Sequence, residues 1–350
     1  MQIIIFVRYS KILEKAQLFL EKYTHEKASV FYALPQSGSS RQNFFATSVG
    51  KDFIITYNDN LPENDSFLYL SSIFSDLKLN TPHIFKVSED RKMYIQEHLG
   101  KRTLSDIIEK EGCSDRVKSI VKQSLTRLYE LQQRTRGQID FSRAFEYERY
   151  DELPIQNDLF YFKSFIADVL EIPYHKSTLL KEFRDLTLKL EQLKPRCLMI
   201  RDFQSRNMMV NDRDEVFFID YQSAMEGPAM YDVISFLYQA KANFPDDFRD
   251  EMLKYYFSHY EDAAARQLLD ESLNPLKLIR FMQVLGAYGF RGLIQRKSHF
   301  MSSLSAGIVN LCRFAVTWDE IEAYPELKKL IQQLKTEESK NKIEAILNKT

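Results

Sequence analysis

The sequence predicts an α+β fold, with a β-rich first part that ends near Glu97 and a longer, mostly helical remainder. Short runs rich in β-branched and aromatic residues fill the first part, as is typical of strands. From residue 103 onward, apolar residues recur at spacings of three and four, which indicates amphipathic helices. A small group of strand-like segments interrupts these helices between Cys197 and Ile219.

The first part alternates between helical and extended patterns. The expected elements are, in chain order, a helix over 11–23, strands over 29–34, 43–48 and 52–57, a helix over 63–75, and strands over 83–87 and 92–97. The second and third strands are separated only by Val49-Gly50-Lys51, which predicts a tight hairpin.

The remainder reads as a series of helices. Ser114 is a plausible N-cap, because the apolar residues that follow it from Val117 to Leu131 are spaced as on one helix face. Further helices are expected over 159–170, over 179–193, and with breaks from 229 to the end, and the interrupting strands over 197–200, 208–210 and 216–219.

Charge and cysteine usage exclude several classes of protein. The net charge is −1, and the 48 basic and 49 acidic residues are interspersed, so neither nucleic acid nor a membrane surface is expected as a partner. Cys113, Cys197 and Cys312 lie far apart, without metal-ligand spacing or a disulfide framework. With no 18-residue apolar run and no signal-like start, the sequence predicts a cytoplasmic protein.

The stretch "CLMIRDFQSRNMMV", residues 197–210, places charged and amide side chains between two apolar runs without any Gly or Pro. Asp202 and Asn207 are five residues apart, and Asp220 ends the apolar run "VFFID" thirteen residues later. Carboxylate and amide oxygens suit Mg²⁺, and a remaining carboxylate can accept a proton from an attacking hydroxyl. This division of labour is that of phosphoryl transfer.

The spacing also matches the kinase signature H-R-D-x-x-x-x-N followed by D-F-G. In this chain the signature reads Ile200-Arg201-Asp202 up to Asn207, and then Asp220-Tyr221-Gln222. Both spacings, the strand-loop-strand context and the β-rich part upstream agree with it.

On these residues the chain resembles the aminoglycoside phosphotransferase and choline kinase family of small-molecule kinases, over about residues 30–310. The stretches "RDFQSRN", "IDYQSAMEGPAMYDVISFL" and "LPQSGSSRQNFF" resemble most the branch that phosphorylates N-acetylmuramate and N-acetylglucosamine. The resemblance implies a two-lobed protein-kinase-like fold, with a nucleotide-binding N-lobe over 1–97 and a helical C-lobe over 98–350. It also implies Mg²⁺, and ATP or GTP as the phosphoryl donor.

The resemblance carries four roles over by position. Asp202 is the expected catalytic base, and Asn207 and Asp220 are the expected metal ligands. Asp232, in "YDVISF", matches an acidic residue that steadies the catalytic loop in such folds.

The chain departs from the kinase pattern at two positions. Ile200 stands where kinases have a His that braces the loop. The phosphate-gripping Lys of strand three is absent, and "DFIITYN" offers only Thr56 or Tyr57 there. Because a phosphate site without a cation loses charge stabilisation, Arg41 is our candidate substitute.

Two more segments are candidates for the nucleotide site. Backbone N–H groups and hydroxyls of Ser37, Gly38, Ser39 and Ser40, beside Arg41, could cover the phosphates, the alternative being a plain hairpin loop. Gln96, Glu97 and His98 fall where a kinase hinge binds the nucleotide base, the alternative being an ordinary linker.

For the acceptor, the candidates are Arg206, Gln222 and Arg291. Arg291 belongs to a basic, glycine-containing segment over 278–300, which could equally be a buried helix pair with a solvated basic face. The sequence thus predicts a kinase that phosphorylates a hydroxyl of a small molecule, by the resemblance an amino sugar.

Two alternatives stay open. The acceptor could be an aminoglycoside, choline or another metabolite, although a cationic acceptor would call for an acidic pocket. The chain could also be a pseudokinase that binds nucleotide as a regulator. The missing Lys and His favour the pseudokinase, and the joint presence of Asp202, Asn207 and Asp220 favours the enzyme.

Overall fold

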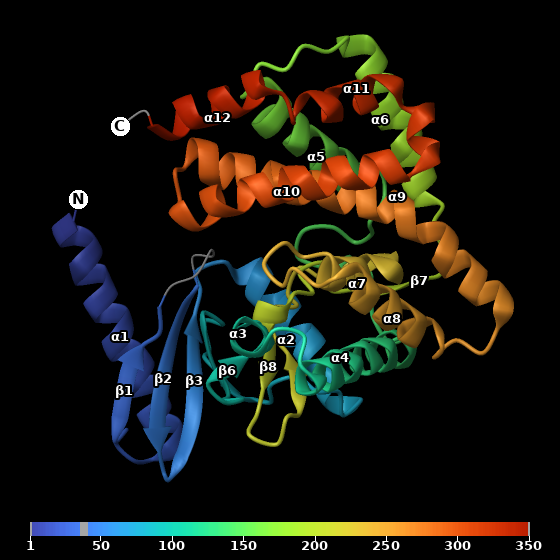
Figure 1. The fold of residues 1–350 in the computed structure, drawn as a ribbon. Coiled ribbons are helices and arrows are strands. Elements are labelled where there is room, and N and C mark those ends of the chain that lie inside the picture. Colours follow the sequence, from blue (N-terminus) through green and yellow to red (C-terminus); the bar gives the residue numbers. More distant parts are fainter. Residues whose placement is uncertain (1, 36–40, 349–350) are drawn as a thin grey trace. The chain divides into compact units, whose positions relative to one another are not determined.

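The structure is a computed structural model that describes residues 2–35 and 41–348. It divides into two compact units (Figure 1). The first unit comprises Met1–Glu148 and Ser205–Ala224, and the second comprises Arg149–Gln204 and Met225–Thr350. The predicted lobes, 1–97 and 98–350, are a different division of the chain, and that lobe boundary stays a prediction.

A five-stranded antiparallel sheet forms the start of the first unit, in the order β1-β2-β3-β5-β4. Its strands are β1 (Val30–Ala33), β2 (Gln42–Ser48), β3 (Lys51–Tyr57), β4 (Ile84–Val87) and β5 (Met93–Glu97). The predicted hairpin between β2 and β3 is confirmed. Val49 and Gly50 both have positive φ, as a two-residue type I′ turn requires.

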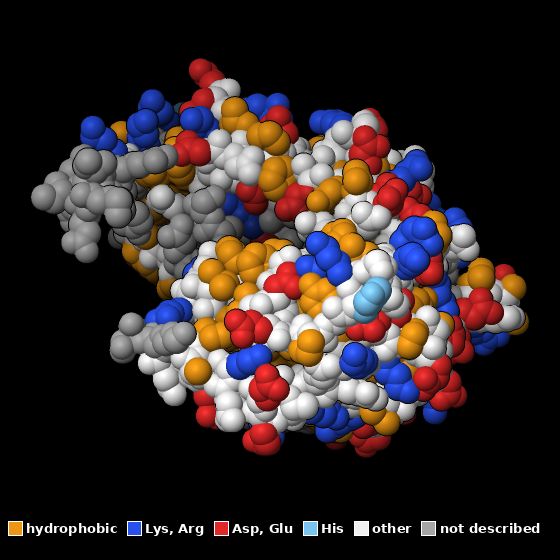
Figure 2. All heavy atoms as spheres, turned by 90° about the horizontal axis from the view of Figure 1, so that it is seen from above, with side chains coloured by type: hydrophobic (Ala, Val, Ile, Leu, Met, Phe, Trp, Pro, Cys, Tyr) orange, Lys and Arg blue, Asp and Glu red, His pale blue; other side chains and the backbone are white. Residues whose placement is uncertain are grey.

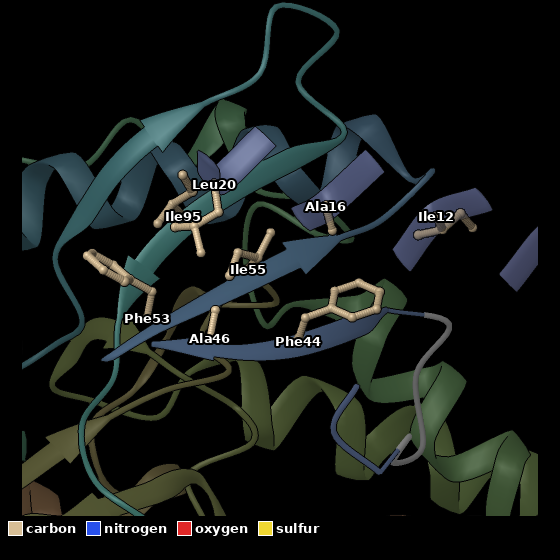
Figure 3. Packing of buried hydrophobic residues seen from close by; sticks show 8 residues of the cluster. All are labelled: Ile12, Ala16, Leu20, Phe44, Ala46, Phe53, Ile55 and Ile95. Carbon is tan, nitrogen blue, oxygen red and sulfur yellow. The ribbon is translucent and has the colours of Figure 1, made fainter. Parts of the chain in front are cut away.

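Helix α1 (Gln2–Thr24) covers one face of this sheet. Ile12, Ala16 and Leu20 repeat at a spacing of four along α1, and they pack on alternate residues of the central strands (Figure 3). The strand residues in this core are Phe44, Ala46, Phe53, Ile55 and Ile95. Burying a side chain the size of Phe or Ile stabilises the fold by roughly 1.5–3 kcal/mol, so this core fixes the sheet that carries Arg41.

Helix α2 (Leu61–Asp76) joins the sheet to the segment that follows the predicted metal ligand Asp220. Its Phe67 stacks on Tyr94 of β5, with ring centroids 5.1 Å apart, and on Tyr221, with centroids 4.9 Å apart. The Ser71 hydroxyl lies 2.7 Å from the Tyr221 hydroxyl. These contacts position both the start of α2 and the residues after Asp220.

The rest of the first unit is a three-stranded sheet with its helices. These are β6 (Arg102–Thr103), β8 (Met208–Val210), β9 (Val216–Phe218), α3 (Leu104–Glu111), α4 (Asp115–Arg134), the 3-10 turns η1 (Phe141–Arg143) and η3 (Ser205–Asn207). The predicted N-cap is confirmed, because the Ser114 hydroxyl accepts a hydrogen bond from Val117 N.

The second unit is mostly helical. Its elements are α5 (Glu152–Phe162), the π-helical η2 (Lys163–Asp168), α6 (Lys176–Glu191), β7 (Arg196–Met199), β10 (Met225–Pro228), α7 (Met230–Leu237), α8 (Asp246–Phe257), α9 (Ala263–Tyr288), the π-helical η4 (Gly289–Ile294), α10 (Ser298–Thr317), η5 (Asp319–Ala323), α11 (Pro325–Gln333) and α12 (Glu337–Asn348). Helices α5 and α10 both pack on α9.

The structure corrects three details of the prediction. The helix expected from Leu159 begins at Glu152, and its end is π-helical. Strand β7 pairs with β10, a strand that sequence reasoning missed because "MEGP" has little strand propensity. Strand β8 pairs with β6 and β9 instead. The strands on either side of Arg201–Asn207 therefore belong to different sheets, rather than being neighbours.

Charged side chains of both signs are interspersed over the face that Figure 2 shows, as the sequence suggested. In residues 2–35 and 41–348, no helix combines the length and the apolar character needed to cross a membrane.

Candidate active site

The backbone before Asp202 is held by Asp232, which is fully buried at the start of α7. Its carboxylate accepts hydrogen bonds from Ile200 N (2.7 Å) and Arg201 N (2.9 Å). These bonds hold Arg201 at a φ of 69°, a conformation that few residues other than glycine adopt. Burial raises the pKa of Asp232 to about 7, although the two N–H groups oppose the rise.

The Arg201 side chain pairs with a buried carboxylate of the same unit. Its Nη2 lies 3.2 Å from Asp158 Oδ1, and the Tyr150 hydroxyl donates to Asp158 Oδ2 over 3.1 Å. Burial raises the pKa of Asp158, and the Arg201 charge opposes this. Sequence reasoning missed Asp158 and Tyr150, because nothing local marks a residue whose partner lies 43 positions away.

Asp202, the predicted base, follows this anchored backbone and is partly exposed. Its Oδ1 accepts a hydrogen bond from Gln204 Nε2 over 2.9 Å. The intervening Phe203 is buried edge-on against Phe236, with ring centroids 5.6 Å apart. The burial of Phe203 and the hydrogen bond from Gln204 thus restrict the orientation of the Asp202 carboxylate.

The predicted metal ligands lie in the first unit, at one end of the β8–β9 ladder. Met208 pairs with Phe218, and Ile219 N donates to Asn207 O over 3.0 Å. Asn207 therefore stands opposite Ile219, one residue before Asp220. An amide and a carboxylate oxygen on adjoining strand ends form a donor set that fits Mg²⁺.

Asp220 also belongs to a cluster around Arg41, which we call the Arg41 cluster: Arg41, Glu63, Asp220 and Gln222. Arg41 Nη2 pairs with Asp220 Oδ1, its Nη1 donates to Gln222 Oε1 (3.2 Å), and its Nε lies 3.4 Å from Glu63 Oε1. Gln222 Nε2 donates to Asp220 Oδ1 over 3.2 Å. Burial lowers the pKa of Arg41, but Asp220, Tyr94 and Glu63 together raise it above its ordinary value.

The cluster places a cation beside a helix carboxylate and the predicted metal ligand. At the position of strand β3 where kinases have Lys, this chain has Thr56, which donates to Asn43 Oδ1 (2.8 Å) and accepts from Gln96 Nε2 (3.1 Å). Arg41, just before β2, reaches the carboxylate of Glu63 near the start of α2. Sequence reasoning proposed Arg41 but missed Glu63, which no motif distinguished from the other acidic residues of the chain.

The predicted hinge residues have structural partners of their own. Gln96 bonds Thr56, and Glu97 accepts a hydrogen bond from His83 N over 3.2 Å. His98 packs edge-on against Phe45, with ring centroids 5.0 Å apart, and burial lowers its pKa. Their role toward a nucleotide base stays a prediction.

The remaining candidates are distributed over both units. Ser37, Gly38, Ser39 and Ser40 lie outside the described residues. Arg206 is exposed in η3 of the first unit. The Gln222 side chain is held within the Arg41 cluster, and Arg291 lies in η4 of the second unit with its guanidinium 5.1 Å from the Phe300 ring centroid. The acceptor role of these three residues stays a prediction.

Comparison with known proteins defines the class to which this fold and site belong. The model of the phosphotransferase enzyme family matches residues 33–269, more than half of the chain, so the protein belongs to that family. The match includes Asp202, Asn207, Asp220 and Asp232.

Individual proteins refine this comparison. An N-acetylmuramate/N-acetylglucosamine kinase of Neisseria meningitidis is 25% identical over 192 residues, which are 54% of this chain and 54% of that kinase. The chain thus matches about half the length of this relative. The choline kinase LicA of Streptococcus pneumoniae has a similar fold, with a TM-score of 0.57 and 14% identity, over 87% of this chain and 99% of LicA.

A ternary complex of an aminoglycoside phosphotransferase, APH(2")-IIa, with streptomycin and ATP has a TM-score of 0.56 and 18% identity, over 82% of this chain and 97% of that one. Likeness to these kinases confirms the predicted kinase-like α+β fold.

Proposed function

We propose that the protein is a Mg²⁺-dependent small-molecule kinase that transfers the γ-phosphoryl group of a nucleoside triphosphate to a hydroxyl of an amino sugar. The observation that carries the proposal is the anchored loop before Asp202, where Asp232 holds two backbone N–H groups and Asp158 holds Arg201. A catalytic base needs such a fixed position, because small displacements from a reactive geometry are costly.

In the proposed reaction Asp202 accepts the proton of the acceptor hydroxyl as its oxygen attacks the γ-phosphorus. A new oxygen–phosphorus bond forms, the bond to the β-phosphate oxygen breaks, and nucleoside diphosphate leaves. Mg²⁺ held by Asn207 and Asp220 would neutralise charge on the phosphates. The loss of the bracing His at Ile200 is offset here by the Arg201–Asp158 pair, which anchors the same loop from another side.

Arg41 supplies the cation that β3 lacks at the Thr56 position. Its position between Glu63 and Asp220 allows its guanidinium to leave Asp220 for a phosphate oxygen while Glu63 keeps it oriented. Guanidinium groups bind phosphate with two parallel hydrogen bonds, so Arg can serve where kinases use Lys. This also weakens the case for a pseudokinase, which rested on the missing Lys and His.

The amino-sugar acceptor is inferred from the relative that acts on N-acetylmuramate and N-acetylglucosamine. The rival acceptors are choline and aminoglycosides, after the structural neighbours. ATP is the first donor to test because a neighbour was solved with ATP, and GTP is the second. The cytoplasm stays a prediction from the sequence.

Phosphorus NMR tests the function directly. The protein is incubated with Mg²⁺, ATP or GTP, and a pool of amino sugars, choline and an aminoglycoside. We expect a new phosphomonoester signal with wild type and with Asp212→Asn, an exposed charge control on the β8–β9 turn. The Asp202→Asn variant should lower the rate by about 10²–10⁴-fold, the usual contribution of a general base.

Equal transfer by Asp202→Asn would remove Asp202 from the mechanism. No transfer by wild type, with Mg²⁺-dependent nucleotide binding intact, would favour the pseudokinase.

A further inference from the structure

Two π-helical turns lie against each other in the second unit. They are η2, which extends α5, and η4, which extends α9. Glycines allow this approach: a Cβ on Gly286 would lie 2.8 Å from Phe162 N, and a Cβ on Gly289 would overlap the Phe165 carbonyl. Single π-helical turns are rare, and those that occur are often at functional sites. This pair of turns is therefore a candidate for ligand recognition.

The paired turns assemble what we call the aromatic–arginine surface: Tyr161, Phe165, Tyr288, Phe290, Arg291 and Phe300. Ring centroids are 4.6 Å apart for Tyr161–Phe165 and 4.8 Å apart for Phe165–Phe290. All six side chains are only partly buried. By contrast, Phe162, next to them on α5, is fully buried. The six residues therefore lie at the edge of the core instead of filling it.

Arg291 differs in its partners from two other arginines of the second unit. In the part of the chain that the structure describes, no carboxylate pairs with it, and its guanidinium lies over the Phe300 ring. By contrast, Arg201 pairs with Asp158, and Arg249 pairs with Asp246. Burial raises the pKa of Tyr161, and the Arg291 charge opposes this. Arg291 and Tyr161 thus offer hydrogen-bond donors without a protein anion to receive them.

The surface is connected to the loop of the proposed base through helix α5. Asp158, which binds Arg201, precedes Tyr161 by three residues, or about 4.5 Å of helix rise. Arg280 on α9 lies near Asp158 and Asp232 and lowers the pKa of both carboxyls against their burial. It is held by Gln283 and so belongs to this buried network, of which Arg291 is not a member.

We propose that the aromatic–arginine surface recognises the acceptor and selects an amino sugar that carries a carboxylate. The apolar face of the sugar ring would pack on Phe165 and Phe290. The carboxylate would accept two parallel hydrogen bonds from the guanidinium of Arg291, with the Tyr161 hydroxyl as a further donor. A small-molecule site usually has a few well-positioned polar groups among aromatic and other apolar side chains. The inference rests on the proposed function, which it deepens by assigning the acceptor's charge.

Isothermal titration calorimetry on the full chain tests this without any phosphoryl transfer. The probes are N-acetylmuramate, which has a carboxylate, and N-acetylglucosamine, which does not. We expect Arg291→Gln to weaken N-acetylmuramate binding at least tenfold and to change N-acetylglucosamine binding less than twofold. Arg291→Lys should recover part of the loss. The matched control is Arg313→Gln, an exposed arginine on α10, which should change neither affinity.

Each other outcome overturns the proposal. Wild type that binds neither sugar, or an Arg291→Gln variant that binds N-acetylmuramate as wild type does, removes the surface as the acceptor site. Equal weakening for both sugars would indicate a structural role for Arg291. Because binding is read without turnover, a protein that binds the acid through Arg291 but transfers no phosphoryl group would overturn the proposed kinase activity alone.

Discussion

The Arg41 cluster of the first unit and the network behind Asp202 in the second unit hold their charges in different ways. In the network, Asp158 and Asp232 are buried, and each of their carboxylate oxygens has a hydrogen-bond donor. In the Arg41 cluster, the Asp220 side chain is 30% exposed, and one of its oxygens receives both Arg41 and Gln222.

This difference in burial distinguishes a structural support, the network behind Asp202, from a binding site, the Arg41 cluster. A buried carboxylate with both oxygens bonded cannot exchange partners without a large desolvation cost. A partly exposed ion pair can exchange, because water and a ligand reach it. We therefore expect the network to fix the position of Asp202, and the Arg41 cluster to rearrange when a metal and phosphates bind.

The largest expected effect comes from breaking the buried pair. Asp158→Asn removes the charge opposite Arg201 and should destabilise the second unit by about 3–5 kcal/mol, as removal of one partner of a buried ion pair does. Denaturant unfolding followed by circular dichroism measures this. Arg184→Gln, which breaks the exposed Arg184–Asp185 pair of the same unit, is the control and should cost less than about 1 kcal/mol. Similar losses for both variants would mean that the network is not the stronger support.

A smaller effect is expected from Arg41→Gln. Losing a charged hydrogen-bond donor to phosphate, at about 1.5–3 kcal/mol, should weaken nucleotide binding roughly 10- to 100-fold, while the unfolding free energy falls less than in Asp158→Asn. Arg41→Lys should recover part of the affinity. The control is Arg91→Gln, from an exposed ion pair with Asp65 in the same unit. Unchanged nucleotide affinity in Arg41→Gln would show that some other group grips the phosphates.

Per pH unit, the smallest effect is the dependence of stability on pH. The pKa of Asp232 is about 7 in the folded protein and near 3.8 when unfolded, so its carboxyl favours folding fully below pH 3.8. That contribution is lost as the pH rises toward 7, by at most about 1.4 kcal/mol per pH unit. The unfolding free energy of wild type relative to Asp232→Asn should therefore fall between pH 4 and 7 and then level off. A difference that is constant with pH would contradict the raised pKa.

Sequence reasoning predicted those parts of the molecule that local patterns determine. Alternating aromatic and β-branched residues predicted the strands of the large sheet, and the spacing of Asp202, Asn207 and Asp220 predicted the kinase-like fold. Ser114 was recognised because a helix cap is a local feature. The resemblance alone pointed to Asp232, whose bonds to the loop span about 30 residues.

The missed residues all depend on partners distant in the chain. Asp158 meets Arg201 across 43 positions, and Glu63 meets Arg41 across 22. The π-helical turns depend on glycine contacts between α5 and α9, which no propensity along either helix predicts. Strand β10 forms because its backbone pairs with β7, although its sequence does not favour a strand.

The central claim is that Asp202 performs chemistry while Asp220 and Arg41 hold the donor. Calorimetric titration of Mg²⁺ and a non-hydrolysable ATP analogue into Asp202→Asn and Asp220→Asn, beside wild type, tests this division most directly. We predict that Asp202→Asn binds the nucleotide within about twofold of wild type, whereas Asp220→Asn loses the Mg²⁺-dependent part of binding. Loss of that binding in Asp202→Asn, or its retention in Asp220→Asn, would contradict the account.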